Sequence, residues 1–286
     1  MQQAKKYSGL NKLEIALHLA MTERNKMNIL DKIIADKRKE VDLKKSIIPV
    51  SQYEASALFG RETSSLAHAL KQSDTGIISE FKRRSPSKAS INQNANVGQV
   101  AKGYEKAGVC GMSVLTDIKY FGGSIEDLIL ARASVQLPLL RKEFIINEYQ
   151  IIEAKAYGAD VILLIAAVLT KQEIKTFSEL AKSLGLDVLL EVHNEEELHK
   201  SIMPSLDMLG VNNRNLKTFE VSLDTSKSLS KLIPDDFVKV SESGISSIEA
   251  IKELTEYGYE GFLIGENFMK TDNPGQSAID FIKKLK

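Results

Sequence analysis

The chain has 286 residues, and its 38 Lys and Arg balance its 38 Asp and Glu, so it carries no basic surface excess for nucleic acid and no charged tail. A single cysteine, Cys110, excludes an intramolecular disulfide, and the four histidines lack metal-ligand spacing, so Cys110 and His193 are interpreted as structural or surface residues. No apolar run is long enough for a membrane span and no signal peptide is evident, which predicts a soluble protein of the reducing cytoplasm.

The N-terminal quarter of the chain has a helical pattern. Residues 1–26 form a poorly defined segment in which 13–21 could make one helix, and Met27 is a candidate natural start. Residues 29–46 place apolar residues on one helical stripe, with Lys and Arg elsewhere. Short helices are expected at 51–59 and 64–71. We therefore expect a helical extension over 27–76 that packs on a catalytic domain formed by 77–286.

From Ile77 onward, short apolar runs alternate with amphipathic segments. The expected strands are 77–82, 111–116, 137–142, 160–166, 187–192, 207–212, 237–242 and 261–265. The expected helices are 97–108, 124–135, 147–157, 171–184, 194–202, 222–232, 247–258 and 276–285. Strands that are apolar on both faces and alternate with helices are typical of a parallel sheet covered by helices. Eight such units predict a closed (β/α)₈ barrel, an α/β fold, with a doubly wound open sheet as the alternative.

The first strand, "IISEFKRRSP", begins as a core strand and then becomes charged. Because side chains alternate between the faces of a strand, Ile78, Glu80 and Lys82 point one way, while Ser79 and Phe81 point the other. Charges at a strand end are usually only solvated. The question is therefore why a carboxylate and an ammonium group share the face that begins with Ile78.

Other strands end in the same manner, and active sites of such barrels lie at the C-terminal ends of the strands. Counting by twos, the inward-facing ends are Glu80 and Lys82, Lys142, Glu191, Asn212, Glu242 and, on the last strand, Gly265. Charged or amide ends on five strands would be a costly way to close a structural core. The pattern therefore predicts that these side chains converge on one catalytic mouth.

A second feature follows the last two strands. Gly244 stands between a strand and a helix, Ser246 and Glu249 have the spacing of a capping box, and the chain turns sharply after Gly265. Barrels often bind phosphate at these two loops through free backbone N–H groups. We therefore expect a phosphate-binding site here.

Taken together, these segments resemble the indole-3-glycerol phosphate synthases, from about Met27 to the end of the chain. The resemblance is carried by "ILDKIIADKRKEV", "EFKRRSPSKASIN", "VLTDIKYFGGS", "LPLLRKEFI", "LLEVHNEEEL", "GVNNRNLKTFEV", "VSESGI" and "FLIGENFMK". It implies conversion of 1-(2-carboxyphenylamino)-1-deoxyribulose 5-phosphate to indole-3-glycerol phosphate in tryptophan biosynthesis, with loss of carbon dioxide and water. It also implies that no metal or organic cofactor takes part.

The resemblance implies catalytic roles for five residues. Lys142 would be the acid that assists ring closure, and Lys82 would hold the substrate carboxylate and share in proton transfer. Glu191 would transfer a proton during dehydration, provided that its pKa is raised, and Glu80 would shuttle protons or orient Lys142. Asn212 would hydrogen-bond the substrate.

The remaining implied residues bind the substrate. Glu242 and Ser243 would contact the sugar hydroxyls or the anilino nitrogen, and Arg214 would serve either the substrate carboxylate or Glu242. The phosphate would be bound at Ser85, Gly244, Gly265 and Glu266. Because the Glu266 carboxylate would repel a phosphate, only its N–H should face the ligand.

One residue departs from the family pattern, and two alternative functions are considered. Glu143 stands where the family more often has aspartate, which leaves the support of Lys142 uncertain. Another phosphosugar barrel, such as phosphoribosylanthranilate isomerase or an aldolase with a Schiff-base lysine, is the enzymatic alternative. A barrel that binds a phosphorylated metabolite without turnover is the non-enzymatic alternative. The expected partner is a small phosphorylated molecule, with neither nucleic acid nor membrane, and the expected state is a monomer, with weak self-association as the alternative.

Overall fold

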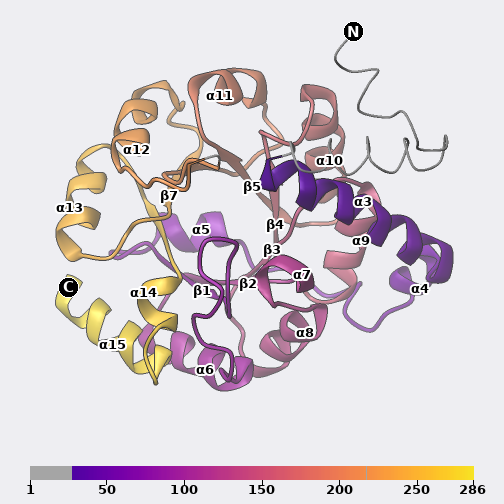
Figure 1. Ribbon diagram of the computed structural model, residues 1–286, viewed down its shortest axis with the longest axis horizontal. Helices are drawn as coiled ribbons and strands as arrows, with labels where there is room; N and C mark the ends of the chain where they lie inside the picture. The colour runs from indigo at the N-terminus through magenta and orange to yellow at the C-terminus, as the bar shows by residue number, and fades with distance from the viewer. Residues whose placement is uncertain (1–27, 217) are drawn as a thin grey trace, which may run out of the picture.

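The computed structural model describes residues 28–216 and 218–286, and these form a closed barrel of eight parallel strands (Figure 1). The strands are β1 Ile77–Phe81, β2 Gly111–Leu115, β3 Leu139–Lys142, β4 Val161–Ile165, β5 Asp187–Val192, β6 Met208–Asn212, β7 Val238–Glu242 and β8 Gly261–Ile264. Each strand pairs with the next along the chain, and β1 pairs with β8 to close the barrel. The predicted (β/α)₈ fold is confirmed, and every predicted strand lies within two residues of the observed one.

Helices surround the barrel between the strands (Figure 1). They are α6 Val97–Ala107, α7 Ile118–Phe121, α8 Ile125–Ser134, α9 Glu148–Ala156, α10 Lys171–Ser183, α11 Glu195–Ser201, α12 Asp224–Leu229, α13 Ile248–Glu256, α14 Glu266–Met269 and α15 Pro274–Leu285, with a 3₁₀ turn at Ser230–Leu232. The four-residue helices α7 and α14 were not predicted. The expected capping box is wrong, because the N-cap of α13 is Ser247, whose side chain accepts from the backbone N–H of Ala250.

Two apolar layers explain why the strands are buried on both faces. One layer lies between strands and outer helices and includes Ile77 and Phe81. The other fills the barrel interior and includes Ile78, Leu140 and Leu189. Successive residues of β1 thus belong to different layers, as the period of a strand requires.

From residue 28 onward, three helices precede the barrel: α3 Ile29–Ile47, α4 Val50–Glu54 and α5 Leu66–Lys71. Leu66 and Leu70 of α5 belong to the interior apolar layer, and in Figure 1 α5 lies behind the strands, so it closes the bottom of the barrel. The helix expected at 51–59 stops at Glu54 and continues as turns. The segment 1–26, its possible helix and the candidate start at Met27 lie outside the described residues.

In Figure 1, helix α3 begins near β5 at the edge of the barrel and runs outward beside α9 to α4. None of the helices in the described ranges is both long and apolar enough to cross a membrane.

Candidate active site

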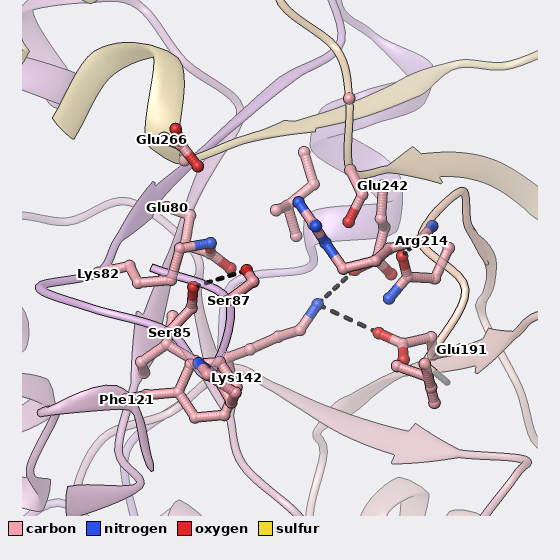
Figure 2. Close-up of a pocket in the computed structure, with 18 of the residues that line it drawn as sticks. Glu80, Lys82, Ser85, Ser87, Phe121, Lys142, Glu191, Arg214, Glu242 and Glu266 are labelled. Carbon is pink, nitrogen blue, oxygen red and sulfur yellow. Dashed lines mark hydrogen bonds and ion pairs between the residues drawn. The ribbon is translucent and has the colours of Figure 1, made fainter. Parts of the chain in front are cut away.

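A pocket of about 380 Å³ opens at the C-terminal ends of the strands. Its lining includes every residue that the sequence singled out for the site, and Figure 2 shows the charged ones turned toward one another. These residues are Glu80, Lys82, Ser85, Lys142, Glu191, Asn212, Arg214, Glu242, Ser243, Gly244, Gly265 and Glu266. The structure therefore brings together side chains from the ends of five strands, the backbone of Gly265 after β8, and the loops that follow these strands.

Lys142, the last residue of β3, has its ammonium group between two carboxylates (Figure 2). Its Nζ donates to Glu242 Oε2 and lies 3.4 Å from Glu191 Oε2. Burial acts to lower the pKa of Lys142, but the carboxylates of Glu242, Glu191 and Glu80 outweigh it and hold that pKa above its ordinary value. Lys142 is therefore a cation at neutral pH and has a proton to give.

The pair from the first strand lies at the same mouth. Lys82 Nζ is 2.5 Å from Glu80 Oε1, and Ser113 Oγ donates to Glu80 Oε2 at 3.4 Å. Burial acts to raise the pKa of Glu80, but Lys82 and Lys142 bring it below its ordinary value, so Glu80 is ionised. The carboxylate and the ammonium group share a strand face because that face leads into the pocket.

Glu242, at the end of β7, is in a different electrostatic state. Its burial, together with the charges of Glu191 and Glu80, raises the pKa of Glu242 to about 7, although Lys142 acts in the opposite direction. The pKa values of Lys142 and Glu242 depend on each other, since the charge of each residue contributes to the shift of the other. Glu242 Oε1 has no hydrogen-bond partner among the described residues. A buried acceptor of this kind is open to a ligand.

Two glycines make room for these carboxylates. A Cβ at position 210 would lie 2.5 Å from Glu242 Oε1, and a Cβ at position 265 would lie 2.6 Å from Glu80 Oε1. Real Cβ atoms do not approach oxygen this closely, so any larger residue would displace the acid. Gly210 was not recognised in the sequence, where it reads as an ordinary residue of a buried strand.

The loops after β6 and β7 are fixed by polar contacts. Asn212 Oδ1 accepts from the backbone N–H of Arg214 at 3.0 Å, and Arg214 Nη1 donates to Phe219 O at 3.1 Å. Ser243 has a φ of 68°, a left-handed conformation that is uncommon outside glycine. Asn213 Nδ2 donates to Ser243 O at 3.1 Å and so holds this turn. Asn213 was missed because nothing in the sequence indicates which way its side chain points.

The expected phosphate loops line one side of the pocket. Ser85 Oγ is 3.2 Å from Ser87 Oγ, and Gly244 has a φ of 79° next to the start of α13. Lys88 Nζ donates to Glu266 Oε1 at 2.7 Å. That hydrogen bond lowers the pKa of Glu266 and pairs its carboxylate, so the negative charge is partly neutralised by Lys88. Ser87 and Lys88 were not selected from the sequence.

A model of the indole-3-glycerol phosphate synthase family matches residues 30–281. The indole-3-glycerol phosphate synthase of Bacteroides thetaiotaomicron is 48% identical over 258 residues, which is 90% of this chain and 99% of that protein. The enzyme of Koribacter versatilis is 41% identical, over 88% of this chain and 98% of that protein. The chain belongs to the indole-3-glycerol phosphate synthase family.

Solved structures with low sequence identity show the fold alone. 3-Hexulose-6-phosphate synthase from Salmonella typhimurium matches with a TM-score of 0.59 at 14% identity, over 73% of this chain and 98% of that one. Thiamine phosphate pyrophosphorylase from Pyrococcus furiosus matches with a TM-score of 0.56 at 14% identity, over 77% of this chain and 99% of that one.

In this synthase-family chain, one part of the pocket lining is apolar. Phe121 and Phe144 lie with ring centroids 6.0 Å apart, and Leu163 and Ile165 of β4 complete the wall inside the barrel. Helix α3 contributes three further apolar residues, Ile29, Leu30 and Ile33. The stripe on 29–46 indicated a packed helix, but it gave no sign that the helix forms part of the pocket.

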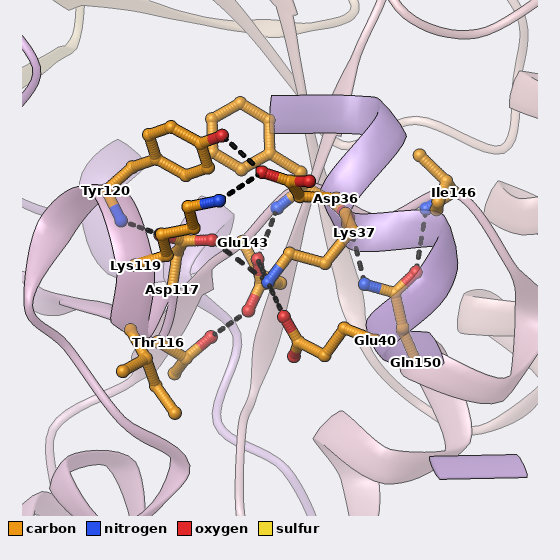
Figure 3. Close-up of polar contacts among 12 residues, drawn as sticks. Asp36, Lys37, Glu40, Thr116, Asp117, Lys119, Tyr120, Glu143, Ile146 and Gln150 are labelled. Carbon is orange, nitrogen blue, oxygen red and sulfur yellow. Dashed lines mark hydrogen bonds and ion pairs between the residues drawn. The ribbon is translucent and has the colours of Figure 1, made fainter. Parts of the chain in front are cut away.

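Lys37 of α3 lies at the centre of a second ionic cluster, next to the pocket (Figure 3). Its side chain is only 2% exposed, and its Nζ lies 3.0 Å from Asp117 Oδ2, 3.0 Å from Glu143 Oε1 and 2.8 Å from Glu40 Oε2. The other oxygen of Glu143 accepts from Thr116 at 2.8 Å. Glu143 therefore anchors the end of β3 to α3, which is a different task from direct support of the neighbouring ammonium group.

A further link joins α3 to α7. Asp36 Oδ2 accepts from Lys119 Nζ at 2.5 Å and from Tyr120 Oη at 2.7 Å (Figure 3). The next residue, Phe121, lines the pocket. Helix α3 thus fixes the position of one aromatic wall residue.

Proposed function

We propose that this pocket catalyses the reaction of indole-3-glycerol phosphate synthase, the closure of an indole ring with loss of carbon dioxide and water. The observation that carries the proposal is the Lys142 ammonium group, held within reach of Glu242 and Glu191 in a pocket with one apolar wall and one loop-lined end. Such a cation stabilises the oxyanion that forms as a ring carbon attacks a ketone.

The shape of the pocket supports the orientation of the substrate. The phosphate is assigned to the hydroxyl group of Ser85, after β1, and to the backbone N–H groups of Gly244, Gly265 and Glu266, in the loops after β7 and β8. The aromatic ring is assigned to the apolar wall that contains Phe121 and Phe144, because aromatic and aliphatic side chains bind rings well. The reacting ketone then lies between these ends, beside Lys142.

Ring closure needs an acid. As the ring carbon bonds to the ketone carbon, Lys142 Nζ donates its proton to the ketone oxygen, which becomes a hydroxyl group. The raised pKa of Lys142 keeps it protonated before this step. Lys82, with its side chain 20% exposed at the mouth, is assigned to the substrate carboxylate.

Two losses then restore aromaticity. The bond to the carboxyl carbon breaks, carbon dioxide leaves, and the electron pair that remains restores the benzene ring. The new hydroxyl group then leaves as water when Glu191 gives it a proton, and the neutral Lys142 takes a proton from the ring carbon next to nitrogen, which forms the double bond of the indole. Glu80, held beside Lys82 at 2.5 Å, orients the lysines through charge.

The remaining groups bind the substrate. The open Oε1 of Glu242 accepts from a sugar hydroxyl or the anilino N–H, and Asn212 and Ser243 add hydrogen bonds from neighbouring strand ends. Arg214, whose guanidinium is held by Phe219 O, is assigned to the substrate carboxylate.

A Schiff-base aldolase would need a neutral lysine as its nucleophile. Because the pKa of Lys142 is held above its ordinary value, this lysine is charged and is a poor nucleophile.

The test incubates the purified chain with 1-(2-carboxyphenylamino)-1-deoxyribulose 5-phosphate and follows indole fluorescence. Appearance of indole-3-glycerol phosphate is expected. Folded protein that gives no product would refute the proposal, and covalent trapping of the substrate on a lysine by borohydride would favour an aldolase.

A further inference from the structure

His193 lies directly behind Glu191 and outside the residues that line the pocket. Its Nε2 is 3.4 Å from Glu191 Oε1, and its Nδ1 is 3.1 Å from Glu197 Oε2. Its side chain is 10% exposed, whereas that of Glu191 is 6% exposed. The sequence had assigned His193 to the surface or to a structural position. The structure places it in line between a site carboxylate and α11.

The hydrogen bonds of Glu197 determine which nitrogen of His193 carries a proton. Glu197 Oε2 also accepts from the backbone N–H of His193 at 2.8 Å, and its Oε1 accepts from Asn194 Nδ2 at 2.9 Å. A carboxylate held in this way can only accept, so Nδ1 of His193 must be the N–H donor. His193 is therefore neutral when Nε2 is unprotonated and positively charged when Nε2 is protonated.

This Nε2 is buried and has no hydrogen-bond partner among the described residues. Oε1 of Glu191 lies 3.4 Å from this nitrogen, while Oε2 of Glu191 lies 3.4 Å from Lys142 Nζ. One oxygen of Glu191 thus belongs to the pocket and the other to His193. A proton between Nε2 and Oε1 would complete a hydrogen bond from His193 to Glu191.

The charges around the ring favour that extra proton. Burial acts to lower the pKa of His193, but the hydrogen bond to Glu197 and the charges of Glu191, Glu197 and Glu242 raise it above its ordinary value. These three carboxylates come from β5, α11 and β7, the elements that face the ring.

The chemistry of the reaction requires a supply of protons. Lys142 gives a proton to the ketone oxygen and recovers one from the ring carbon next to nitrogen, so it ends the cycle protonated. The substrate carboxylate leaves as neutral carbon dioxide, and the hydroxyl group takes one further proton to leave as water, so each turnover takes up one proton from solution. The acid that supplies this proton must be recharged before the next turnover.

We propose that His193 is a positioning residue that orients Glu191 and recharges it with a proton. The proposal rests on the function proposed above. After Glu191 has protonated the leaving hydroxyl group, its carboxylate takes the proton of His193 Nε2. Neutral His193 then takes a proton from solvent at the same nitrogen, while Glu197 keeps Nδ1 protonated and the ring in place.

The first test compares the variants His193→Gln and His199→Gln with the wild type. His199 is a matched control, because it lies on α11 and its side chain is 59% exposed. His193→Gln is expected to lower kcat about tenfold or more, with KM within threefold, since proton transfer by a positioned group contributes about 10²–10⁴-fold. The loss should increase toward high pH, where solvent supplies fewer protons. His199→Gln should match the wild type.

An unchanged kcat in folded His193→Gln would overturn the proposal, and so would a loss that is the same at every pH. Wild-type protein without turnover would instead refute the proposed function, so the two failures are distinguishable.

A second measurement needs no change at His193. Nitrogen-15 NMR of the histidines, recorded against pH, should show Nδ1 of His193 protonated throughout and Nε2 titrating. The variant Glu191→Gln should lower the pKa of His193, because it removes a facing charge. A pKa that does not move, or an Nε2 that stays protonated while Nδ1 titrates, would overturn the proposal.

Discussion

Two ionic clusters lie side by side at the C-terminal end of the barrel, and they differ in how completely they are paired. The anchor cluster surrounds one buried lysine of α3, and the mouth cluster surrounds Lys142. The anchor cluster consists of Lys37, Glu40, Asp117 and Glu143. The mouth cluster consists of Glu80, Lys82, Lys142, Glu191 and Glu242.

The two clusters shift the pKa values of similar carboxylates in opposite directions. Burial acts to raise the pKa of Glu143, but Lys37 and Arg141 bring it below its ordinary value, and both of its oxygens have partners. Burial raises the pKa of Glu242, and its Oε1 has no hydrogen-bond partner among the described residues. A fully paired cluster holds structure, whereas an incompletely paired one retains capacity for a ligand and for proton exchange.

Removing the cation of the anchor cluster should have the largest effect on stability. Lys37→Met leaves three carboxylates without their common partner, and loss of one member of a buried ion pair costs about 3–5 kcal/mol. Thermal unfolding should therefore begin well below the wild-type temperature. Lys39→Met, on an exposed site of the same helix, is the control and should change little. Equal melting temperatures for the two variants would contradict the structural role of this cluster.

The contribution of the mouth cluster to stability should depend on pH. The pKa of Glu242 in the folded protein, about 7, is above that of an unfolded glutamate, so its contribution to stability is complete below about pH 4.3 and is lost as pH rises through 7. Glutamine does not ionise, so Glu242→Gln does not lose stability in this way. From pH 5 to pH 8 the variant should gain up to about 3 kcal/mol relative to the wild type, at about 1.4 kcal/mol per pKa unit. Denaturant titrations of the wild type and Glu242→Gln at pH 5 and pH 8 measure this difference. An equal change in the free energy of unfolding of both proteins between the two pH values would refute the prediction.

Filling the space beside Glu80 should disturb the mouth cluster more moderately. Gly265→Ala places a methyl group 2.6 Å from Glu80 Oε1, and overpacking of this kind costs about 1–3 kcal/mol. Turnover should fall at least tenfold, because a displaced acid no longer meets the substrate. Gly60→Ala is the control, since a Cβ there meets no atom within 4 Å. Wild-type turnover in Gly265→Ala would show that Glu80 can move without consequence.

The smallest effect is expected at the exposed edge of the pocket. Lys88 and Glu266 pair with side chains 43% and 45% exposed, and such pairs contribute about 0–1 kcal/mol. Glu266→Gln should leave the melting temperature almost unchanged and alter KM by less than threefold, because only the backbone N–H of this residue is assigned to the phosphate. A KM change of more than tenfold would place the carboxylate itself in contact with the substrate.

Much of this architecture is predictable from the sequence because it depends on local periodicity. Apolar runs that alternate with amphipathic segments predict all eight strands, and counting by twos from Ile78 places Glu80 and Lys82 on the inward face. The same parity identifies Lys142, Glu191 and Glu242, since Lys142 and Glu242 end their strands, Glu191 is the last residue but one of β5, and the ends of parallel strands meet.

The features that were missed depend on contacts between distant parts of the chain. Lys37 is one lysine among several on an amphipathic helix, and only the approach of Glu143, more than 100 residues later, makes it a buried cation. His193 follows Glu191 by two residues, but its role depends on the direction of its ring. Helices α7 and α14, of four residues each, are too short to produce a periodic signal.

Steady-state kinetics of Lys142→Met measure whether the Lys142 ammonium group is the acid of ring closure. Methionine has a similar length and no charge. We expect kcat to fall about 10²–10⁴-fold while KM changes by less than about fivefold, because the lost interaction strengthens in the transition state. A folded variant with wild-type kcat and a greatly raised KM would show that Lys142 only binds the substrate.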